Sequence, residues 1–168
     1  QEKTEGCITE IKYGLLYNWY AATDVRLIAA DGWEVPTQTH ITTLRTYLGG
    51  TTIAGGKLKE TGFTHWHTPN TGATNETLFN LRANGHRPPT GIYSALTYQG
   101  DFWSRTESTS QYAYHAWADH DLAYLNIAAN GVFKQAGNGI RLIKTTTILS
   151  DGQTGTYTGN DGKVYRTI

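Results

Sequence analysis

One stretch, residues 85–144, constrains the fold most, because it is dense in aromatic residues and follows no regular hydrophobic period. It holds two of the five Trp, five of the eleven Tyr and three of the six His of the chain. Two short segments in it, 101–107 and 139–144, have sequences that are dictated by the fold. Between them lie aromatic and small polar residues that follow no clear period. Tyr and Trp give large contact area at low entropy cost, and Ser, Asn and Gly give adaptable hydrogen bonds. The stretch therefore predicts a binding surface on irregular backbone.

Composition restricts the class of protein further. The 168 residues are enough for one domain that buries roughly 70% of its unfolded surface, and charged residues make up only 17%, against about 25% in a typical domain. The net charge is zero and no basic stripe is present, so we expect no nucleic-acid partner. No apolar run approaches the roughly 20 residues that span a bilayer, so we expect no membrane insertion, and no signal-peptide region is visible.

Few residues indicate chemistry. The single cysteine, Cys7, excludes an internal disulfide and a zinc site of several cysteines. It is either a small half-buried apolar residue or a reactive or intermolecular thiol. The Gly-x-Ser-x-Gly and His-Glu-x-x-His motifs are absent, and we expect no enzymatic activity.

The clearest helix is predicted over 38–48. Thr37 is a good N-cap after Pro36, an apolar stripe recurs at spacings of three and four from Ile41 to Leu48, and Gly49-Gly50 is typical of a helix end. A helical turn or two is expected within 15–22, from similar spacings.

Other signals are shorter. The glycines of 54–58 predict a turn or a close backbone approach, and 61–80 predicts an irregular segment with Trp66 as a buried anchor. Short strands are expected after Phe102. Asn130-Gly131 predicts a hairpin that joins 125–127 to 132–134, and 163–168 predicts a terminal strand.

Two groups of residues could hold a metal. His65 and His67 would share one face of an extended segment, although two loop histidines bonded to neighbours are the simpler interpretation. The second group is listed here: His115, Asp119, His120 and Asp121. Neither group compels a metal, calcium included, and no cofactor is predicted.

Several motifs recur in order along residues 11–144 and together are specific. They are Tyr13-Gly14-Leu15-Leu16-Tyr17-Asn18-Trp19-Tyr20-Ala21, Gly32-Trp33-Glu34-Val35-Pro36-Thr37, Tyr47-Leu48-Gly49-Gly50, Ala54-Gly55-Gly56-Lys57-Leu58-Lys59-Glu60, Thr64-His65-Trp66, Pro69-Asn70-Thr71-Gly72-Ala73-Thr74-Asn75-Glu76, Gly85-His86-Arg87, Phe102-Trp103-Ser104-Arg105-Thr106-Glu107, Ala116-Trp117 and Gly139-Ile140-Arg141. In these motifs the chain resembles the Fibrobacter succinogenes major paralogous domain. It departs from the pattern at His67, where Asn is commoner, and near Leu142, where a Cys is usual. The Asp-Gly-x-Val-Tyr strand that often opens the domain occurs here only at the C-terminus.

The resemblance implies an α+β, C-type-lectin-like fold with short twisted antiparallel strands, one or two helices and long irregular loops. This binding domain would span 1–146. Residues 147–168 would form a β-rich tail that closes the fold or leads into a neighbouring domain.

Members of the family are surface and secreted proteins of Bacteroidetes-like bacteria and of their phages, and some are the variable proteins of diversity-generating retroelements. The resemblance therefore implies an extracellular, cell-surface or virion location and a receptor-binding or adhesion module, with a cell-surface protein or glycan as its partner. The alternative is a structural or assembly domain of a larger surface or virion protein, which contacts a second copy or a neighbouring domain through its tail.

The expected ligand-binding residues are the unpatterned ones of the aromatic stretch. They are Ile92, Ser94, Thr97, Tyr98, Gln99, Asp101, Tyr112, Tyr114, His115, Trp117, Asp119, His120, Tyr124 and Asn126. All of these except Tyr98 and Trp117 are expected to be diversified. Most of these residue types can arise from an Asn codon by changes at adenines, whereas Thr97 and Gln99 fit that scheme less well.

Overall fold

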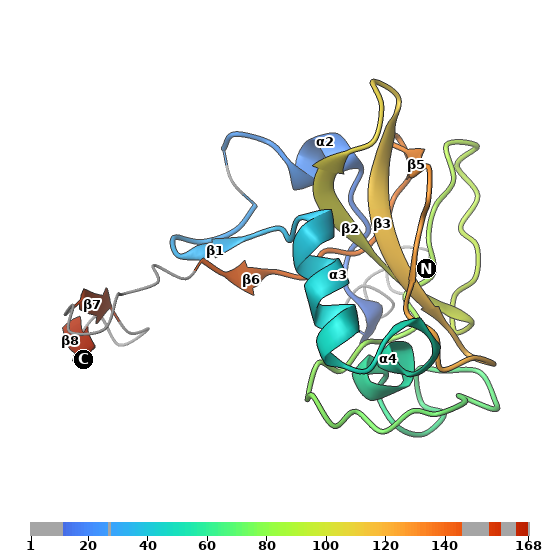
Figure 1. Cartoon of the computed structure of the whole chain (residues 1–168). Coiled ribbons are helices and arrows are strands. Elements are labelled where there is room, and N and C mark those ends of the chain that lie inside the picture. The colour runs from blue at the N-terminus through green and yellow to red at the C-terminus, as the bar shows by residue number, and fades with distance from the viewer. Residues whose placement is uncertain (1–11, 27, 146–154, 159–163, 168) are drawn as a thin grey trace, which may run out of the picture.

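The computed structural model describes residues 12–26, 28–145, 155–158 and 164–167. The predicted α+β class is confirmed, with helices, short antiparallel strands and long irregular loops (Figure 1). The elements in chain order are α2 (Trp19–Ala22), β1 (Trp33–Glu34), α3 (Gln38–Tyr47), α4 (Thr51–Leu58), β2 (Gln99–Glu107), β3 (Tyr112–Asp119), β4 (Asn126–Ile127), β5 (Val132–Phe133), β6 (Ile143–Lys144), β7 (Gly155–Thr158) and β8 (Val164–Thr167).

The centre of the fold is the ribbon formed by β2 and β3, which pair antiparallel with Gln99 opposite Asp119 and Trp103 opposite His115. A shift of register between Trp103 and Glu107 interrupts β2. The other edge of β3 pairs with β4 at one end and with β5 at the other. Figure 1 shows this ribbon running the height of the molecule.

The hairpin predicted at Asn130-Gly131 is wrong. β4 and β5 do not pair with each other, because both lie along the same edge of β3. The Asn-Gly pair belongs to the residues that bulge out between β4 and β5. Gly131 has φ +78°, and a Cβ on it would meet the backbone of Ala113. The two segments that flank Asn130-Gly131 thus form one interrupted strand along β3 and not a hairpin.

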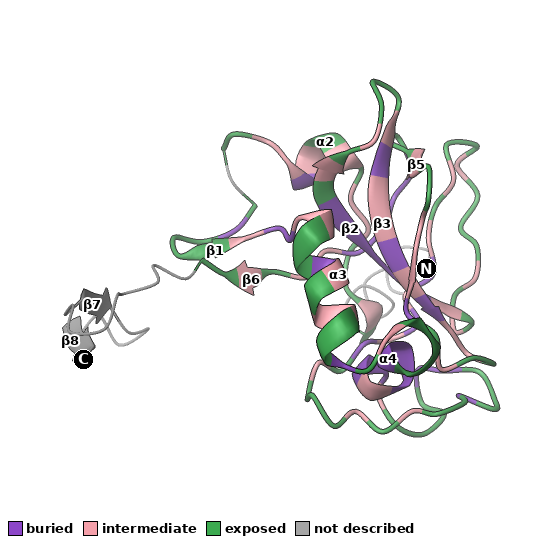
Figure 2. Ribbon diagram, in the orientation of Figure 1, coloured by how far each residue is buried: buried purple, intermediate pink, exposed green. Residues whose placement is uncertain are grey.

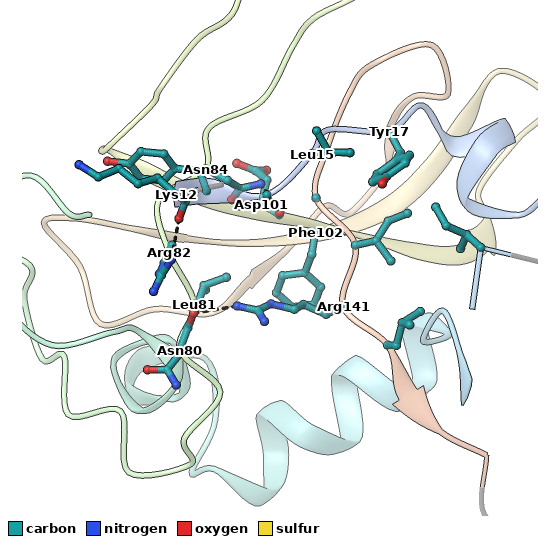
Figure 3. A pocket seen from close by; sticks show the side chains of 16 residues that line it. Lys12, Leu15, Tyr17, Asn80, Leu81, Arg82, Asn84, Asp101, Phe102 and Arg141 are labelled. Atoms are coloured by element: carbon teal, nitrogen blue, oxygen red, sulfur yellow. Dashed lines mark hydrogen bonds between the residues drawn. The ribbon is translucent and has the colours of Figure 1, made fainter. Parts of the chain in front are cut away.

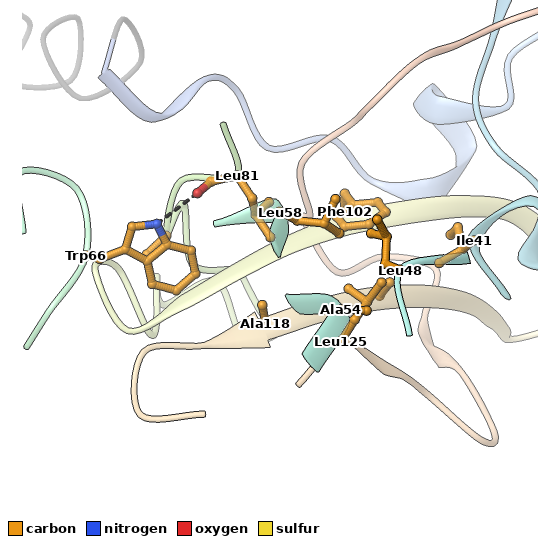
Figure 4. Packing of buried hydrophobic residues seen from close by; sticks show 11 residues of the cluster. Ile41, Leu48, Ala54, Leu58, Trp66, Leu81, Phe102, Ala118 and Leu125 are labelled. Carbon is orange, nitrogen blue, oxygen red and sulfur yellow. Dashed lines mark hydrogen bonds between the residues drawn. The ribbon is translucent and has the colours of Figure 1, made fainter. Parts of the chain in front are cut away.

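One face of the ribbon covers the larger apolar core, drawn in Figure 4. Phe102 from β2 and Ala116 and Ala118 from β3 project to this face, as the alternation of side chains along a strand requires. The helices and loops that pack on them contribute Ile41, Leu48, Ala54, Leu58, Trp66, Leu81, Ala83 and Leu125. Each large side chain buried here contributes roughly 1.5–3 kcal/mol to folding.

The opposite face of the ribbon carries a smaller core at one end. Trp103 and Ala113 are fully buried there and pack with Ala22 and Ala136. The indole Nε1 of Trp103 donates to the carbonyl of Tyr17 at 2.7 Å. Both faces of the ribbon are therefore packed near this end, and Figure 2 shows the buried and half-buried positions that alternate along β3.

The predicted helix over 38–48 is confirmed as α3, which ends one residue earlier. The Thr37 hydroxyl accepts from the backbone N–H of His40 at 3.1 Å, and the His40 ring accepts from the Thr37 N–H at 3.3 Å. Gly49 and Gly50 follow with φ of +102° and +94°. The helix expected within 15–22 is the single turn α2.

The turn predicted from the glycines of 54–58 is wrong, because these residues lie in helix α4. The alternative prediction for these glycines, a close backbone approach, is confirmed. A Cβ on Gly55 would overlap the carbonyl oxygen of Tyr124, and a Cβ on Gly56 would overlap that of Gly72. The glycines thus let a helix lie directly against two stretches of backbone.

The long segment between α4 and β2 is irregular, as expected, and Trp66 anchors it. This side chain is 2% exposed, and its Nε1 donates to the carbonyl of Leu81 at 2.8 Å (Figure 4). The segment is tied to the end of the ribbon by backbone bonds from His67 to Thr97 and from Thr71 to His120.

The strand predicted at the C-terminus is confirmed as β8, which pairs antiparallel with β7. Cys7 and the other residues of 1–11, together with 27, 146–154, 159–163 and 168, lie outside the described residues. Within the described part of the chain, no helix is long and apolar enough to cross a membrane.

Candidate ligand-binding face

The second face of the ribbon is polar along half of its length. Gln99 and Asp101 of β2 lie opposite Asp119 and Trp117 of β3, and strand alternation places all four on the side away from the larger core. Asn126 of β4 lies opposite Trp117 and extends this side. Three neighbouring strands therefore present polar and aromatic side chains in one plane.

Asp119 is the centre of a hydrogen-bond network on this side. Its carboxylate accepts from the Gln99 amide at 2.9 Å, from the Trp117 indole at 3.2 Å and from the Asn126 amide at 3.3 Å. Burial raises the pKa of Asp119, and these hydrogen bonds oppose the rise. The network fixes three side chains from three strands, so this part of the surface is preorganised.

A second carboxylate, Asp101, lies beneath the surface. It is 2% exposed, and its Oδ1 lies 3.1 Å from Nδ1 of His115. Its Oδ2 lies 3.7 Å from Nδ1 of His86, and the nearby Asp101 carboxylate raises the pKa of His86. The His115 ring is stacked on the Trp117 ring, with 5.0 Å between centroids. Asp101 thus orients side chains that are closer to the surface.

Three rings cluster beyond the end of the ribbon. His67 stacks on Tyr98 with a centroid distance of 4.4 Å, and His120 meets both rings edge-on at 5.2 and 5.0 Å. Tyr98 is 45% exposed, and His67 is exposed as well. A backbone bond from His120 to Tyr98 and a contact from the His120 ring to the carbonyl of Thr68 hold the cluster together.

A buried lysine holds the turn that follows β3. Lys59 is fully buried, and its Nζ donates to the carbonyls of Asp119 and Leu122 at 2.9 Å each. The same group lies 5.1 Å from the centroid of Trp66. Burial lowers the pKa of Lys59 to about 8, and the charges of Asp119 and Asp121 oppose this shift. Lys59 therefore positions the backbone of the polar surface from below.

We define the ribbon face as these surface residues of the polar side and the ring cluster. It consists of His67, Tyr98, Gln99, His115, Trp117, Asp119, His120 and Asn126.

A family model described as the Fibrobacter succinogenes major domain matches residues 6–144. The chain belongs to this family. Searches of curated proteins and of solved structures each returned no match.

In this major domain, the fold brings together about half of the residues predicted to bind ligand. Seven of them belong to the ribbon face, and Thr97 and Asp101 adjoin it from the loop and from below. Ile92 and Ser94 lie in the exposed loop before β2, and Ile92 is 75% exposed. Tyr124 lies in the connection between β3 and β4.

Tyr112 and Tyr114 lie apart from the rest. They alternate with His115 and Trp117 along β3, so they project from the opposite side of the ribbon. The Tyr112 ring packs on Phe133 with 4.5 Å between centroids. A ligand on the ribbon face of the major domain would not contact either tyrosine.

His67, His86 and Lys59 are the residues of this region that were absent from the predicted binding set. His67 and Lys59 belong to segments distant in sequence from β2 and β3, and no local pattern indicates that the chain returns to the ribbon. The segment that contains His67 lies beside the ribbon because Trp66 is buried and donates a hydrogen bond to Leu81.

The two histidine groups considered for metal binding are separated by the fold. His65 is buried and bonds to Glu60, whereas His67 is exposed on Tyr98. His115 bonds to Asp101, and His120 to the Thr68 carbonyl. Among the described residues of the major domain, no group of three or more His, Cys, Asp or Glu could hold a metal ion.

Proposed function

We propose that this major domain is a receptor-binding module and that the ribbon face is its binding surface. The observation that carries the proposal is the exposed stack of His67 and Tyr98 beside the fixed polar network of Asp119. Exposed rings give contact area, and prepositioned amides and carboxylates give directional bonds, which is the composition of a ligand site. The larger core lies on the other side of the ribbon, so the surface can change without loss of the main packing.

The surface suits a cell-surface receptor, either protein or glycan. Flat rings such as Tyr98 and Trp117 pack on apolar patches of proteins and on the faces of sugars. Asp119, Gln99 and Asn126 offer acceptors and donors to hydroxyls and peptide groups. Such a module acts outside the cell, displayed on a bacterial surface or on a phage tail fibre.

We further propose that this face is diversified by a retroelement. The polar positions of β2 and β3 alternate with buried core positions, so the two classes of residue interleave along the same strands. A mechanism that changes only selected codons would alter the face and leave Phe102, Ala116 and Ala118 intact.

The binding proposal is tested by selecting a ligand for the full chain on arrays of glycans and of extracellular receptor domains. The dissociation constant is then measured by surface plasmon resonance. We expect Tyr98→Ala to weaken binding by roughly 1–4 kcal/mol, as removal of a central aromatic anchor does. Tyr47→Ala is the matched control, because Tyr47 is 85% exposed on α3 and should leave the affinity unchanged.

The Trp117→Ala variant distinguishes a binding role of Trp117 from a structural one. Lower affinity with an intact melting temperature supports a binding role, whereas a lower melting temperature with unchanged affinity makes Trp117 structural. If Tyr98→Ala, His120→Ala and Trp117→Ala all keep full affinity for the selected ligand, the ribbon face is not the binding surface.

A further inference from the structure

A second concave site lies away from the ribbon face. It is a cavity of about 630 Å³ between the N-terminal segment, the chain around Leu81 and the chain around Ile140 (Figure 3). No residue of the ribbon face lines it. Its volume falls within the roughly 300–1,000 Å³ typical of small-molecule sites.

The walls of this cavity carry an excess of positive charge. Lys12, Arg82 and Arg141 line it, and Asp101 is the one acidic residue among the described residues of the lining. The Asp101 carboxylate is 1% exposed and is directed at His115 and His86. This carboxylate is therefore not directed at the cations of the cavity.

The two guanidinium groups are held in place but are only partly neutralised. Arg141 donates from Nη2 to the carbonyl of Asn80 at 2.7 Å and lies 4.8 Å from the centroid of Phe79. Within the described part of the chain, Arg141 forms no salt bridge. Arg82 donates to the carbonyl of Lys12 at 2.7 Å, and its Nε lies 3.4 Å from Glu60. Burial, and secondarily the charge of Arg82, lower the pKa of Arg141.

These contacts leave hydrogen-bond donors unused. Arg141 has Nε and Nη1 free of protein partners among the described residues, and Arg82 has Nη2. An anion placed against both groups would accept these bonds and relieve the repulsion between the two cations. The planar guanidinium fork matches the geometry of a carboxylate.

Part of the remaining lining is aliphatic. Leu15, Ile28 and Leu142 line it and are 46%, 37% and 38% exposed. Such exposed aliphatic side chains beside cations suit a molecule that has a charged end and an apolar body.

We propose that this cavity binds a small organic carboxylate, with the carboxylate at Arg82 and Arg141 and the apolar body against Leu15 and Leu142. The site shares no residue with the ribbon face as defined above and would give the domain a second, small-molecule ligand.

The test uses benzoate as the probe, benzamide as its neutral isostere and the full chain labelled with ¹⁵N. We expect benzoate to shift the amide resonances of 80–84 and 139–142 in a saturable way. Benzamide should bind at least about tenfold more weakly, because hydrogen bonds from a guanidinium to a charged carboxylate are stronger than those to a neutral amide. Arg82→Gln and Arg141→Gln should each weaken benzoate binding by about tenfold or more.

Arg105→Gln is the matched control, because Arg105 pairs with Glu34 away from the cavity and should not change the affinity. If Arg141→Gln does not fold, Arg82→Gln decides the matter. The proposal is overturned if benzoate and benzamide bind equally, or if Arg82→Gln binds benzoate as the wild type does. A failure of this kind leaves the ribbon-face proposal unaffected, because that site is read out with a different ligand.

Discussion

At the scale of single residues, Asp101 lies under the ribbon face between two imidazoles, and it makes the stability of the face depend on pH. Its Oδ2 and the Nδ1 of His86 are both buried and lack a closer partner among the described residues. When His86 is protonated, the pair forms a charge-assisted bond. When His86 is neutral, the attraction is lost and the carboxylate oxygen stays buried.

The direction of the pH effect follows from the raised pKa of His86. A group whose pKa is higher in the folded state stabilises that state fully below its unfolded pKa, near 6.5, and loses this contribution as pH rises through the folded value. We expect the free energy of unfolding to fall as the pH rises above about 6.5, measured by denaturant titration at several pH values.

The control for this prediction is a second histidine. His86→Asn should flatten the pH dependence, whereas His67→Asn, on an exposed ring of the same region, should keep it. An unchanged slope in His86→Asn would assign the effect to other groups.

At the same scale, the sequence predicted which residues lie at the surface of the site better than it predicted the buried residues that support them. Tyr98, Trp117 and His120 stand in an aromatic stretch that is visible without a structure. His86 and Lys59 owe their roles to burial and to distances across the fold, and a sequence pattern contains neither.

At the scale of elements, α4 is the helix whose position decides where the face lies. Gly55 lets it contact the backbone of Tyr124, in the connection that leads from β3 to β4. Glycine inside a helix costs about 1 kcal/mol relative to alanine, so the contact itself must explain its presence here.

We therefore expect Gly55→Ala to destabilise the domain by about 1–3 kcal/mol, as overpacking does, in spite of the better helix propensity of alanine. Thr52→Ala on the exposed side of α4 is the control and should be neutral or slightly stabilising. Denaturant unfolding measures both, and a Gly55→Ala variant as stable as the wild type would contradict the close approach.

The elements also show which signals are local. Helix α3 was predictable because its cap at Thr37, its apolar stripe and its terminal glycines are all contiguous. Helix α4 was not predictable from local sequence. Its glycines are required by contacts with the backbone of Gly72 and Tyr124, which are distant in the chain. The prediction of a hairpin at Asn130-Gly131 was wrong for the same reason, because both flanking strands pair with the distant strand β3 and not with each other.

At the scale of the whole molecule, the ribbon divides the residues into those that pack and those that face outward. This division predicts where natural variation is tolerated. Sequencing of the coding region across one natural population should show substitutions between Ile92 and Asn126 at codons that contain adenine. Phe102-Trp103-Ser104 and Gly139-Ile140-Arg141, which carry core and cavity residues, should stay constant.

The structure sharpens this expectation within the predicted set. Exposed positions such as Ile92 and Ser94 should tolerate changes of side chain, whereas a change at the buried Asp101 would leave His86 and His115 without their partner. An invariant stretch from Ile92 to Asn126 would exclude diversification and favour a receptor binder of fixed specificity.

The interrupted edge along β3 has a consequence for proteins displayed close together. An unbroken edge strand offers a row of free peptide groups to which a neighbouring chain can add, and this is a common route to aggregation. Here β4 and β5 are two residues long each, and the bulge with Gly131 separates them. Among the described residues, this edge offers a neighbouring copy no continuous strand to pair with, so we expect copies of the domain at high concentration not to polymerise through it.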